Sequence, residues 1–466
     1  MDQPLLPRRA FLTQLGHGLC AFGGGGLLGG LGRRAGAEDP LAARRPHFAP
    51  RARRMIFLFM HGGPSQVDTF DWKPLLQRDD GKPLPFARPR VTFAKTENLM
   101  ASPWRFAQHG QCGAWVSELF PHLARGVDRL CFVKSLHGTN DAHGGALLAL
   151  HTGSDTFVRP SMGSWLLYGL GSESRDLPGY LTICPTLGHG GVNNWSAAFL
   201  PGAFQGTPVG HAGVPAEQAR IPHLTPQAED AALQPGQLEL LARLNRAHLA
   251  ARDEDAVLRA RAESFALAYR MQQVAPLAMD VERETPATRR LYGLDDPVTA
   301  NFGRQCLLAR RLVEAGVRVV QCSHSYKWDQ HSDLKRDHAR NAREVDLPIA
   351  GLLHDLAARG LLEDTLVLWA GEFGRTPVAQ GRDGRDHNPH GFTVWLAGGG
   401  VRAGHSHGAT DAYGYYATED KVHVHDLHAT ILHLFGLDHE RLTYRHAGRD
   451  FRLTDVHGEV VRGILA

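Results

Sequence analysis

Cysteine is scarce in this chain, and the few cysteines lack the close spacing of a metal-binding or redox site. Six cysteines are present, at positions 20, 112, 131, 184, 306 and 322, and none forms a Cys-x-x-Cys pair. This spacing gives no indication of a metal-binding or redox pair of thiols. Cys131, Cys184 and Cys322 lie inside apolar, strand-like runs, so we expect buried free thiols.

An excess of charge of one sign is also missing. The chain has 466 residues, with 51 basic and 48 acidic side chains. Residues 1–37 contain four basic side chains and one acidic side chain, so the rest of the chain has 47 of each kind. This balance gives no electrostatic reason to expect nucleic acid or an anionic membrane as a partner. With 43% hydrophobic and 21% charged residues, the composition is that of a globular protein with a large core.

The N-terminus has no uninterrupted hydrophobic run. The stretch 11–32 is rich in Gly and Leu, but Gln14 and His17 interrupt it, which makes it too weak for a membrane span. A pair of arginines at 8–9 precedes it, and the small residues "AGA" follow at 35–37. This pattern resembles a twin-arginine export signal, with a disordered basic tail as the alternative. We therefore expect a periplasmic or secreted protein.

The remaining chain shows one change in composition. If residues 1–37 are the signal, residues 38–54 form a basic linker and residues 55–466 a single domain without a membrane-spanning segment. The stretch 205–300 opens rich in Gly and Pro and becomes rich in Ala, Arg and Glu. This shift favours a helical insertion over a separate domain. The sequence contains no internal repeat.

Apolar strand-like runs alternate with helical patterns along the domain. The predicted strands cover 55–60, 130–136, 180–185, 317–324, 365–373 and 392–398. The predicted helices cover 116–127, 143–153, 161–171, 302–316, 344–364 and 425–437. This alternation predicts an α/β fold with a mostly parallel central sheet and helices on both faces. Ligands of such sheets bind beyond the carboxyl ends of the strands, so the loops there should meet at one edge.

Two common catalytic motifs are missing from the loop after the first strand, "HGGPSQVDTFDWKP". The loop lacks the GxxxxGK[ST] phosphate-binding pattern. Ser65 has no neighbouring base, so its spacing does not indicate a serine nucleophile. His61 and Asp68 remain as additional candidate site residues on this loop.

Two short motifs carry ligands for a divalent metal. In "KWDQHSD" an extended chain would point Asp329 and His331 to the same side. In "GRDGRDHNPHG" Asp386 and His387 stand just before a strand, and Glu372, at the end of the preceding strand, would bridge the two halves. Carboxylates and imidazoles in this combination suit Zn²⁺ or a similar ion. The alternative for Asp329 and His331 is a solvated loop.

Arg375 and His143 are the candidate catalytic residues. Arg375 follows the strand end in "WAGEFGRTP", and its planar guanidinium would hold an anionic substrate through two contacts. His143 begins a predicted helix, where backbone N–H groups and the helix dipole favour an anion. It is a candidate nucleophile, base or further ligand.

The acidic candidates also have an ordinary structural explanation. Glu372 would then form an internal ion pair with Arg375, and Asp386 one with Arg385 or Arg382. Two separate ion pairs would leave no shared site. Carboxylates that share one ion must instead lie only a few ångströms apart.

Six motifs in order resemble the domain-of-unknown-function 1501 family of exported bacterial proteins. They are "FLFMHGGPSQVDTFDWKP", "WDQHSD", "LVLWAGEFGRTP", "GRDHNPHGFTVWLAGGGVRAG", "GATDAYGY" and "DLHATILHLFGLDHERLTYRHAGRDFRLTDVHG". That family is related by fold to the alkaline phosphatase and sulfatase superfamily. The resemblance implies an alkaline-phosphatase-like three-layer sandwich with metal ions at the carboxyl ends of the central sheet. It also implies hydrolysis of phosphate or sulfate esters, with an anionic small molecule or a polysaccharide ester as partner.

The comparison with that superfamily carries over only in part. It implies Glu372 at the place of an aspartate ligand, but Phe373 stands where a histidine ligand is expected. His143 takes the place of the nucleophile, with no Ser, Thr or Cys there, and His61 stands where another aspartate ligand is expected. His387 would match the last histidine ligand.

Two functions from different classes follow from these residues. The first is an exported metal-dependent hydrolase of phosphate or sulfate esters, which the intact Asp, His and Glu residues favour. The second is a non-catalytic module on the same fold that binds envelope polysaccharide or a partner protein, which the departure at Phe373 favours. The metal content of the folded protein separates the two.

Overall fold

The computed structural model describes residues 39–87, 96–222, 224, 233–250 and 256–466. The predicted signal peptide lies outside the described residues. Among the described helices, none is long and apolar enough to cross a membrane. Cys131, Cys184 and Cys322 are buried free thiols, which confirms the expectation for them.

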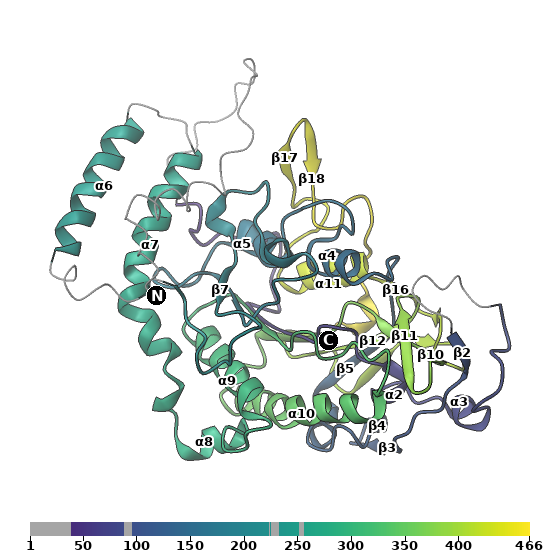
Figure 1. Ribbon diagram of the computed structural model, residues 1–466. Coiled ribbons are helices and arrows are strands. Elements are labelled where there is room, and N and C mark those ends of the chain that lie inside the picture. The colour runs from purple at the N-terminus through teal and green to yellow at the C-terminus, as the bar shows by residue number, and fades with distance from the viewer. Residues whose placement is uncertain (1–38, 88–95, 223, 225–232, 251–255) are drawn as a thin grey trace, which may run out of the picture. The chain divides into compact units, whose positions relative to one another are not determined.

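A nine-stranded sheet lies at the centre of the fold (Figure 1). Its strands follow the order β13-β5-β12-β9-β1-β8-β6-β7, and β16 also pairs with β5. Their bounds are β1 Arg54–Phe59, β5 Leu130–His137, β6 Tyr180–Ile183, β7 Thr207–Val209, β8 Val319–Ser323, β9 Thr365–Ala370, β12 Phe392–Ala397, β13 His405–His407 and β16 Val422–His423. The register places Ile56 of β1 opposite Val320 of β8 and Val367 of β9.

The sheet is mixed but mostly parallel, as the sequence predicts. The pairs of β1 with β8 and β9, of β6 with β7 and β8, and of β5 with β13 and β16 are parallel. Among the described strands of this sheet, only β12 runs in the opposite direction, between β5 and β9. The predicted α/β class is therefore confirmed.

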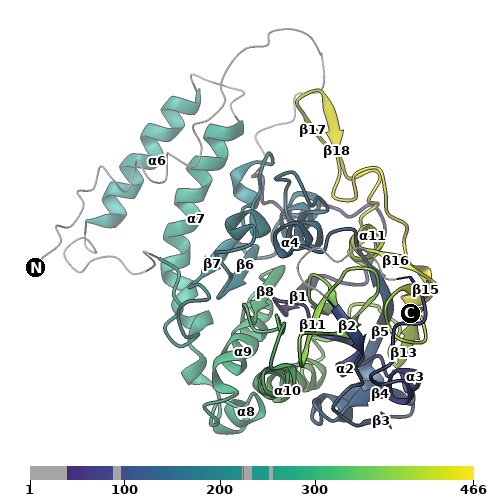
Figure 2. The same cartoon turned by 45° about the vertical axis from the view of Figure 1, so that its right-hand side comes forward.

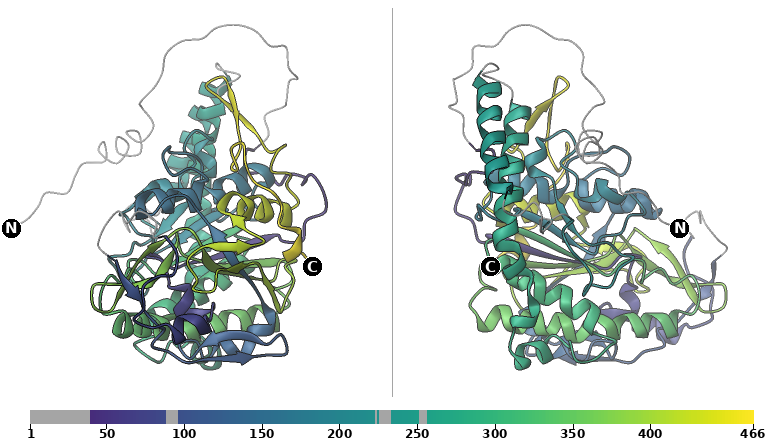
Figure 3. Two further views of the ribbon diagram at one scale, coloured as in Figure 1. Left: turned by 90° about the vertical axis from the view of Figure 1, so that its right-hand side faces the viewer. Right: turned by 60° about the vertical axis from the view of Figure 1, so that its left-hand side comes forward.

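Helices cover both faces of the sheet (Figures 1 and 3). On one face lie α9 Ala300–Glu314 and α10 Leu334–Ala358; on the other lie α4 His143–Thr152, α5 Met162–Leu170 and α11 Val424–Leu434. Successive residues of β1 point to opposite faces. Ile56 and Leu58 pack into the core under α9 and α10, whereas Phe57 and Phe59 pack into the core under the other three helices.

Smaller elements complete the described part of the chain. A three-stranded sheet has the order β11-β10-β2, and β3 with β4, β14 with β15 and β17 with β18 form pairs. The strands are β2 Thr96–Leu99, β3 Phe106–His109, β4 Ala114–Ser117, β10 Gly374–Gln380, β11 Gly384–Asn388, β14 Ala409–Thr410, β15 Ala417–Glu419, β17 Tyr444–His446 and β18 Arg449–Phe451. The other helices are α2 Gln66–Thr69, α3 Pro74–Arg78, α6 Gln234–Ala250, α7 Ala256–Met279, α8 Pro286–Leu291, and the short η1 Leu123–Arg129, η2 Gly191–Trp195, η3 Gly202–Phe204, η4 Val281–Arg283 and η5 Arg462–Ile464.

The stretch 205–300 contains the helices α6, α7 and α8, but it begins with β7, a strand at the edge of the main sheet. Helix α7 lies next to this edge, and α6 packs beside α7 on the side away from the sheet (Figure 2). Of the expected linker 38–54, the last residue already belongs to β1, and the described residues before it are hydrogen-bonded to the domain: the backbone N–H of Arg44 donates to the carbonyl of Leu170 at 2.9 Å and that of Arg51 to the carbonyl of Leu434 at 2.8 Å.

Several local elements differ from the sequence-based expectation. The helix predicted over 344–364 is α10, which covers Leu334–Ala358 and so begins and ends earlier. Residues 116–127, predicted as a helix, contain the end of β4 and most of the 3₁₀ turn η1. Pro121 explains the difference, because proline disfavours the helical conformation of the residue before it. The hairpin of β10 and β11, which the apolar pattern does not predict, places Arg375 directly opposite His387.

Candidate metal centre

Several strand ends bring the candidate residues to one edge of the sheet. Strands β1, β8 and β9 are parallel neighbours, so the loops that carry His61, Asp329 and Glu372 leave from the same edge. Strand β12 runs the other way, so the hairpin before it, with His387, lies at that edge too. Strand β5 also ends there and leads into α4, whose first residue is His143.

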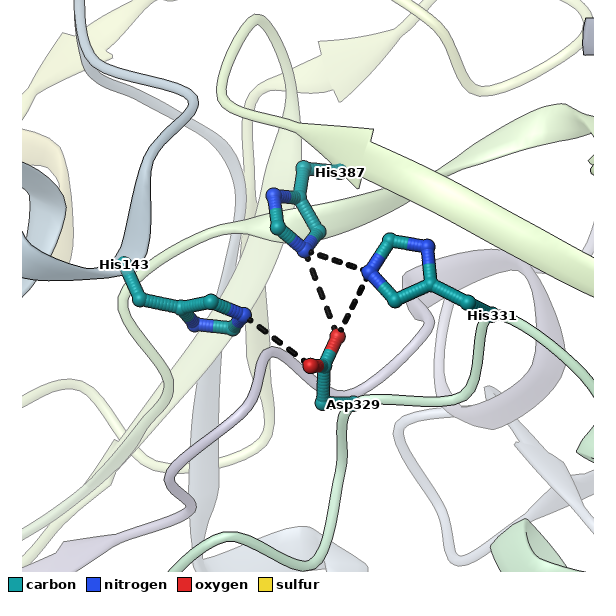
Figure 4. A group of neighbouring side chains, drawn as sticks. All are labelled: His143, Asp329, His331 and His387. Atoms are coloured by element: carbon teal, nitrogen blue, oxygen red, sulfur yellow. Dashed lines mark hydrogen bonds and ion pairs between the residues drawn. The ribbon is translucent and has the colours of Figure 1, made fainter. Parts of the chain in front are cut away.

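Asp329 lies between three histidines that come from different segments of the chain (Figure 4). Its Oδ1 is 2.9 Å from Nε2 of His331 and 3.2 Å from Nε2 of His387, and its Oδ2 is 3.3 Å from Nε2 of His143. The Nε2 atoms of His331 and His387 are 3.0 Å apart. The fold thus brings the predicted ligands Asp329, His331 and His387 together with His143, all four ligand atoms lying within 4.8 Å of one another.

A hydrogen-bond acceptor stands behind two of these rings. Nδ1 of His387 is 2.6 Å from the backbone carbonyl of Asp141, and Nδ1 of His331 contacts Oε1 of Gln380. An oxygen of this kind can only accept, so each neutral ring carries its proton on Nδ1. The lone pair is left on Nε2, the atom that faces Asp329.

His143 is held in the same way by Glu372. Nδ1 of His143 is 2.7 Å from Oε1 of Glu372, and the two carboxylate oxygens accept from the N–H of Gly62 at 3.0 and 3.1 Å. The sequence predicts Glu372 as a metal ligand, but the structure places it behind His143, at the nitrogen that points away from Asp329. It is buried there, 4% exposed, two residues after the end of β9. A carboxylate in this position orients a metal-binding imidazole and raises its basicity.

This donor set fits a divalent ion such as zinc. Three imidazole lone pairs and one carboxylate converge, a combination that Zn²⁺ prefers. Ligands bound tetrahedrally at roughly 2.0–2.1 Å would be about 3.3 Å apart. The Asp329 oxygens lie 2.9–3.3 Å from the three Nε2 atoms, and one ligand atom of each residue lies within 4.8 Å of the others. The Nε2 atoms of His331 and His387 are 3.0 Å apart, a distance that requires a proton or a metal ion between them.

The electrostatics of the cluster favour a cation. Burial alone would raise the pKa of Asp329, but histidine rings beside it, where they carry a proton on Nε2 in place of an ion, and the charge of Arg375 hold it well below its usual range. Burial would lower the pKa of His143, but the carboxylates of Asp329 and Glu372 raise it to about 9. A proton on His143 balances this negative charge, and a metal ion would balance it in the same place.

Arg375 is buried against the cluster, with 1% of its side chain exposed. Its Nη2 lies 2.7 Å from Oδ1 of Asp329. Its other hydrogen bonds go to the backbone carbonyls of Gly62, Gly63, Trp328 and Arg385. The sequence predicts that Arg375 holds an anionic substrate. In the structure, its N–H groups instead donate to backbone carbonyls and to Asp329, whose position they fix. The alternative ion pair with Glu372 is replaced by two other contacts, Arg375 to Asp329 and Glu372 to His143.

Two predicted acidic residues lie outside the cluster. Asp68 forms a buried ion pair with Arg385, with 2.7 Å between Oδ2 and Nε. Asp386 accepts from the N–H of His387 at 2.8 Å, and its Oδ1 is 4.0 Å from Nδ1 of His331. Neighbouring residues of β11 point to opposite sides, so Arg385 turns toward Asp68 and away from Asp386, its expected alternative partner. Asp386 thus supports the end of the hairpin without entering the ligand cluster.

A second group of histidines, His61, His143 and His189, adjoins the cluster. Nε2 of His61 is 3.2 Å from Nδ1 of His189, and the rings of His143 and His189 are stacked with centroids 4.9 Å apart. Nδ1 of His61 accepts from the N–H of Tyr326 at 3.2 Å. The proton of His61 therefore sits on Nε2, the opposite of the arrangement in the first cluster, and burial lowers its pKa to about 4. His61 does not fit as a metal ligand.

A pocket of about 330 Å³ opens over the cluster. It is lined by Ala142, His143, Gly144, His189, Asp329, His331 and His387. This volume suits a small ligand or one group of a larger one. Phe373, which stands where the resemblance implies a histidine ligand, instead packs flat on His387 with ring centroids 4.3 Å apart.

His189 is the pocket residue that sequence reasoning missed. It stands alone between glycines in "LGHGG", far from every motif discussed above. The one signal in the sequence is this glycine-rich setting, which is typical of a tight turn. The backbone of His189 does adopt a left-handed conformation, with φ of 46°.

Residues 52–465 match the family model described as "Protein of unknown function (DUF1501)". The chain belongs to the DUF1501 family. The match covers the central sheet, the cluster and the pocket, so these features lie in the DUF1501 part of the chain. No curated protein matches the sequence of this DUF1501 protein.

The DUF1501 protein is similar to several solved structures at low sequence identity. The lipoteichoic acid synthase LtaP from Listeria monocytogenes is 11% identical over 89% of this chain and 78% of its own, with a TM-score of 0.34. The PsFucS1 sulfatase from a Pseudoalteromonas species is 12% identical over 84% of this chain and 69% of its own, with a TM-score of 0.32. The alkaline phosphatase from the Antarctic bacterium TAB5 is 9% identical over 82% of this chain and 98% of its own, with a TM-score of 0.31. These similarities carry no information about activity, which must be argued from the side chains.

Proposed function

We propose that this protein is a divalent-metal-dependent hydrolase of phosphate or sulfate esters. The observation that carries the proposal is the orientation of three histidines, whose Nδ1 atoms all face acceptors and whose Nε2 atoms all face Asp329. The acceptors behind the rings leave Nε2 as the atom through which each ring can bind an ion, and Asp329 adds a carboxylate at the same point. Hydrogen bonds that orient ligand rings in this way are typical of metal sites.

A divalent ion held here would supply a Lewis acid that polarises an ester oxygen. The residues of the chain would hold this ion and orient its ligands. Asp329, His331, His387 and His143 are the ligand set, Glu372 fixes the ring of His143, and the buried Arg375 fixes Asp329. The pocket lining contains no Ser, Thr or Cys among the described residues, so the attacking nucleophile would be water.

A second function is supported by the number of ligands. Four protein ligands can close a tetrahedral zinc site, and closed sites are typically structural, whereas catalytic sites keep a position open. In that case the protein is a non-catalytic module whose pocket binds an envelope polysaccharide or a partner protein. The two functions predict different coordination numbers for the bound ion.

The deciding experiment starts with the metal content of the full chain, purified without chelators and measured by elemental analysis. We expect about one divalent ion per chain. The cobalt-substituted protein should give the weak visible absorption of a five-coordinate ion, and the zinc protein should hydrolyse p-nitrophenyl phosphate or p-nitrophenyl sulfate. An intense four-coordinate cobalt spectrum without hydrolysis would favour the binding module. Only trace metal in the wild type would end the hydrolase proposal.

We propose in addition that the protein is exported by the twin-arginine route, on the basis of the arginine pair at 8–9 and the "AGA" at 35–37. Replacing Arg8 and Arg9 by Lys should leave the precursor in the cytoplasm. The measurement is the ratio of precursor to processed product in the cytoplasmic and periplasmic fractions. Unchanged export of the double variant would contradict the proposal.

A further inference from the structure

The hydrogen bonds behind the second group of histidines fix the position of two protons. The backbone N–H of Tyr326 can only donate, and it points at Nδ1 of His61 over 3.2 Å. Nδ1 of His61 therefore carries a lone pair, the ring is neutral, and its proton sits on Nε2. That Nε2–H faces Nδ1 of His189 over 3.2 Å.

The same reasoning applies to the next ring. Since Nδ1 of His189 accepts from His61, His189 is also neutral, and its own proton sits on Nε2. Among the residues that the structure describes, none is seen to accept a hydrogen bond from this Nε2–H. His189 lines the pocket, beside the candidate ligands His143 and Asp329. The chain from Tyr326 through His61 to His189 thus ends in a donor at the pocket.

The loop holds His189 in a conformation that few side chains adopt. Its φ of 46° lies in the left-handed region, which is costly for a residue with a Cβ. The side chain of Asn194 donates to the carbonyl of His189 at 3.1 Å. A Cβ on Gly188 would collide with the hydroxyl of Tyr326, so a larger residue at this turn would displace the Tyr326 side chain. Strain held by such contacts is typical of functional sites.

We propose that His189 is a fixed neutral hydrogen-bond donor to an oxyanion ligand in the pocket, with the position of its proton set by Tyr326 through His61. The ligand class, a phosphate or sulfate group, rests on the proposed function. No proton moves in this role, because the ring donates in the form in which the protein holds it. The pair His61 and His189 is accordingly a binding element and not part of a second metal site.

The position of the protons is tested directly by ¹⁵N NMR of the full chain labelled at histidine. Long-range ¹H–¹⁵N spectra distinguish a protonated from an unprotonated ring nitrogen, and the signals are assigned by their loss in His61→Gln and His189→Ala. We expect Nε2–H and a bare Nδ1 for both rings, with or without metal. A proton on Nδ1 of either ring would overturn the proposal.

The binding role is tested with inorganic phosphate and inorganic sulfate as probes on the metal-loaded protein, by calorimetry. His189→Ala should weaken binding of the preferred anion roughly 10- to 100-fold, the usual contribution of a hydrogen bond to a charged group. His189→Gln, which retains an N–H donor, should recover part of the loss. The exposed His354→Ala serves as control and should bind like the wild type.

The metal content and the anion affinity of His189→Ala distinguish a failure of this proposal from a failure of the proposed metal site. Metal content should be unchanged in His189→Ala, and a loss of metal there would overturn the proposal. An unchanged affinity for phosphate and sulfate in His189→Ala, or no binding of either by the metal-loaded wild type, would overturn it as well. If the wild type holds no metal, the proposed function fails, while the NMR measurement on the metal-free chain still decides the proton positions.

Discussion

Replacing His331 or His387 by alanine should remove the bound divalent ion from the purified protein. Each ring contributes one of four ligand atoms, and an acceptor behind it fixes its orientation, so its removal leaves three ligands. The affinity should fall by more than the roughly 10- to 100-fold that is typical of changes behind a ligand. Metal per chain after dialysis, measured by elemental analysis, gives the result.

The variant Glu372→Gln should have a smaller effect on metal binding than the loss of a ligand. It keeps the shape of the side chain but removes the charge behind His143, so the metal should bind more weakly, by roughly 10- to 100-fold, without being lost. His354→Ala, on the exposed side of α10, is the control and should retain the wild-type metal content. If Glu372→Gln loses metal as completely as His331→Ala, Glu372 is itself a ligand. Equal metal content in all variants would mean that the cluster is not the binding site.

The fold could be predicted from local patterns because its strands are buried on both faces. Runs such as "MIFLFM" and "TLVLWA" are apolar throughout, and amphipathic helices lie between them. This pattern fixes the class but not the direction of each strand. The antiparallel β12 follows the β10–β11 hairpin, and short polar hairpins of this kind carry no apolar signal. The 3₁₀ turn after Pro121 was likewise hidden behind an apparent helical spacing.

The candidate site could be predicted only as far as its motifs reach. Asp329 and His331 are two residues apart, and His387 stands before a predicted strand, so chemistry and position both pointed to them. What Glu372 contacts depends on where α4 brings His143, 229 residues away in the sequence. The acceptors behind the other two rings, a backbone carbonyl and the amide of Gln380, leave no recognisable motif because such groups occur throughout any chain.

Replacing Asp68 by asparagine should destabilise the protein by about 3–5 kcal/mol, the usual effect of breaking a buried ion pair. Asp68 and Arg385 are fully buried, with Oδ2–Nε and Oδ1–Nη2 distances of 2.7 and 3.2 Å. Without the carboxylate, the guanidinium of Arg385 stays buried with an unbalanced charge. Arg385 also donates to the carbonyl of Met100 at 3.0 Å, so it cannot turn out to solvent without losing further contacts. Urea unfolding followed by tryptophan fluorescence measures the change.

Two comparisons test this explanation. Glu118→Gln breaks the exposed pair with Arg105, whose side chains are 40% and 91% exposed, and should cost only about 0–1 kcal/mol. The double variant Asp68→Leu with Arg385→Met removes both charges and should be more stable than Asp68→Asn, since an apolar pair needs no compensation. A double variant less stable than Asp68→Asn would show that the other contacts of Arg385 matter more than the ion pair.

The stability that Asp68 contributes should also depend on pH, in a direction that follows from the shift of its pKa. Burial alone would raise the pKa of Asp68, but the charge and hydrogen bonds of Arg385 outweigh it and hold the pKa below its ordinary value. A carboxyl whose pKa is lower in the folded state stabilises the fold above its unfolded pKa of about 3.9, and this contribution is lost as the pH falls through the lower folded value. The difference in stability between wild type and Asp68→Asn should therefore be constant from pH 7 to about 5 and shrink only in stronger acid. A difference that already disappears near neutral pH would mean that another group is responsible.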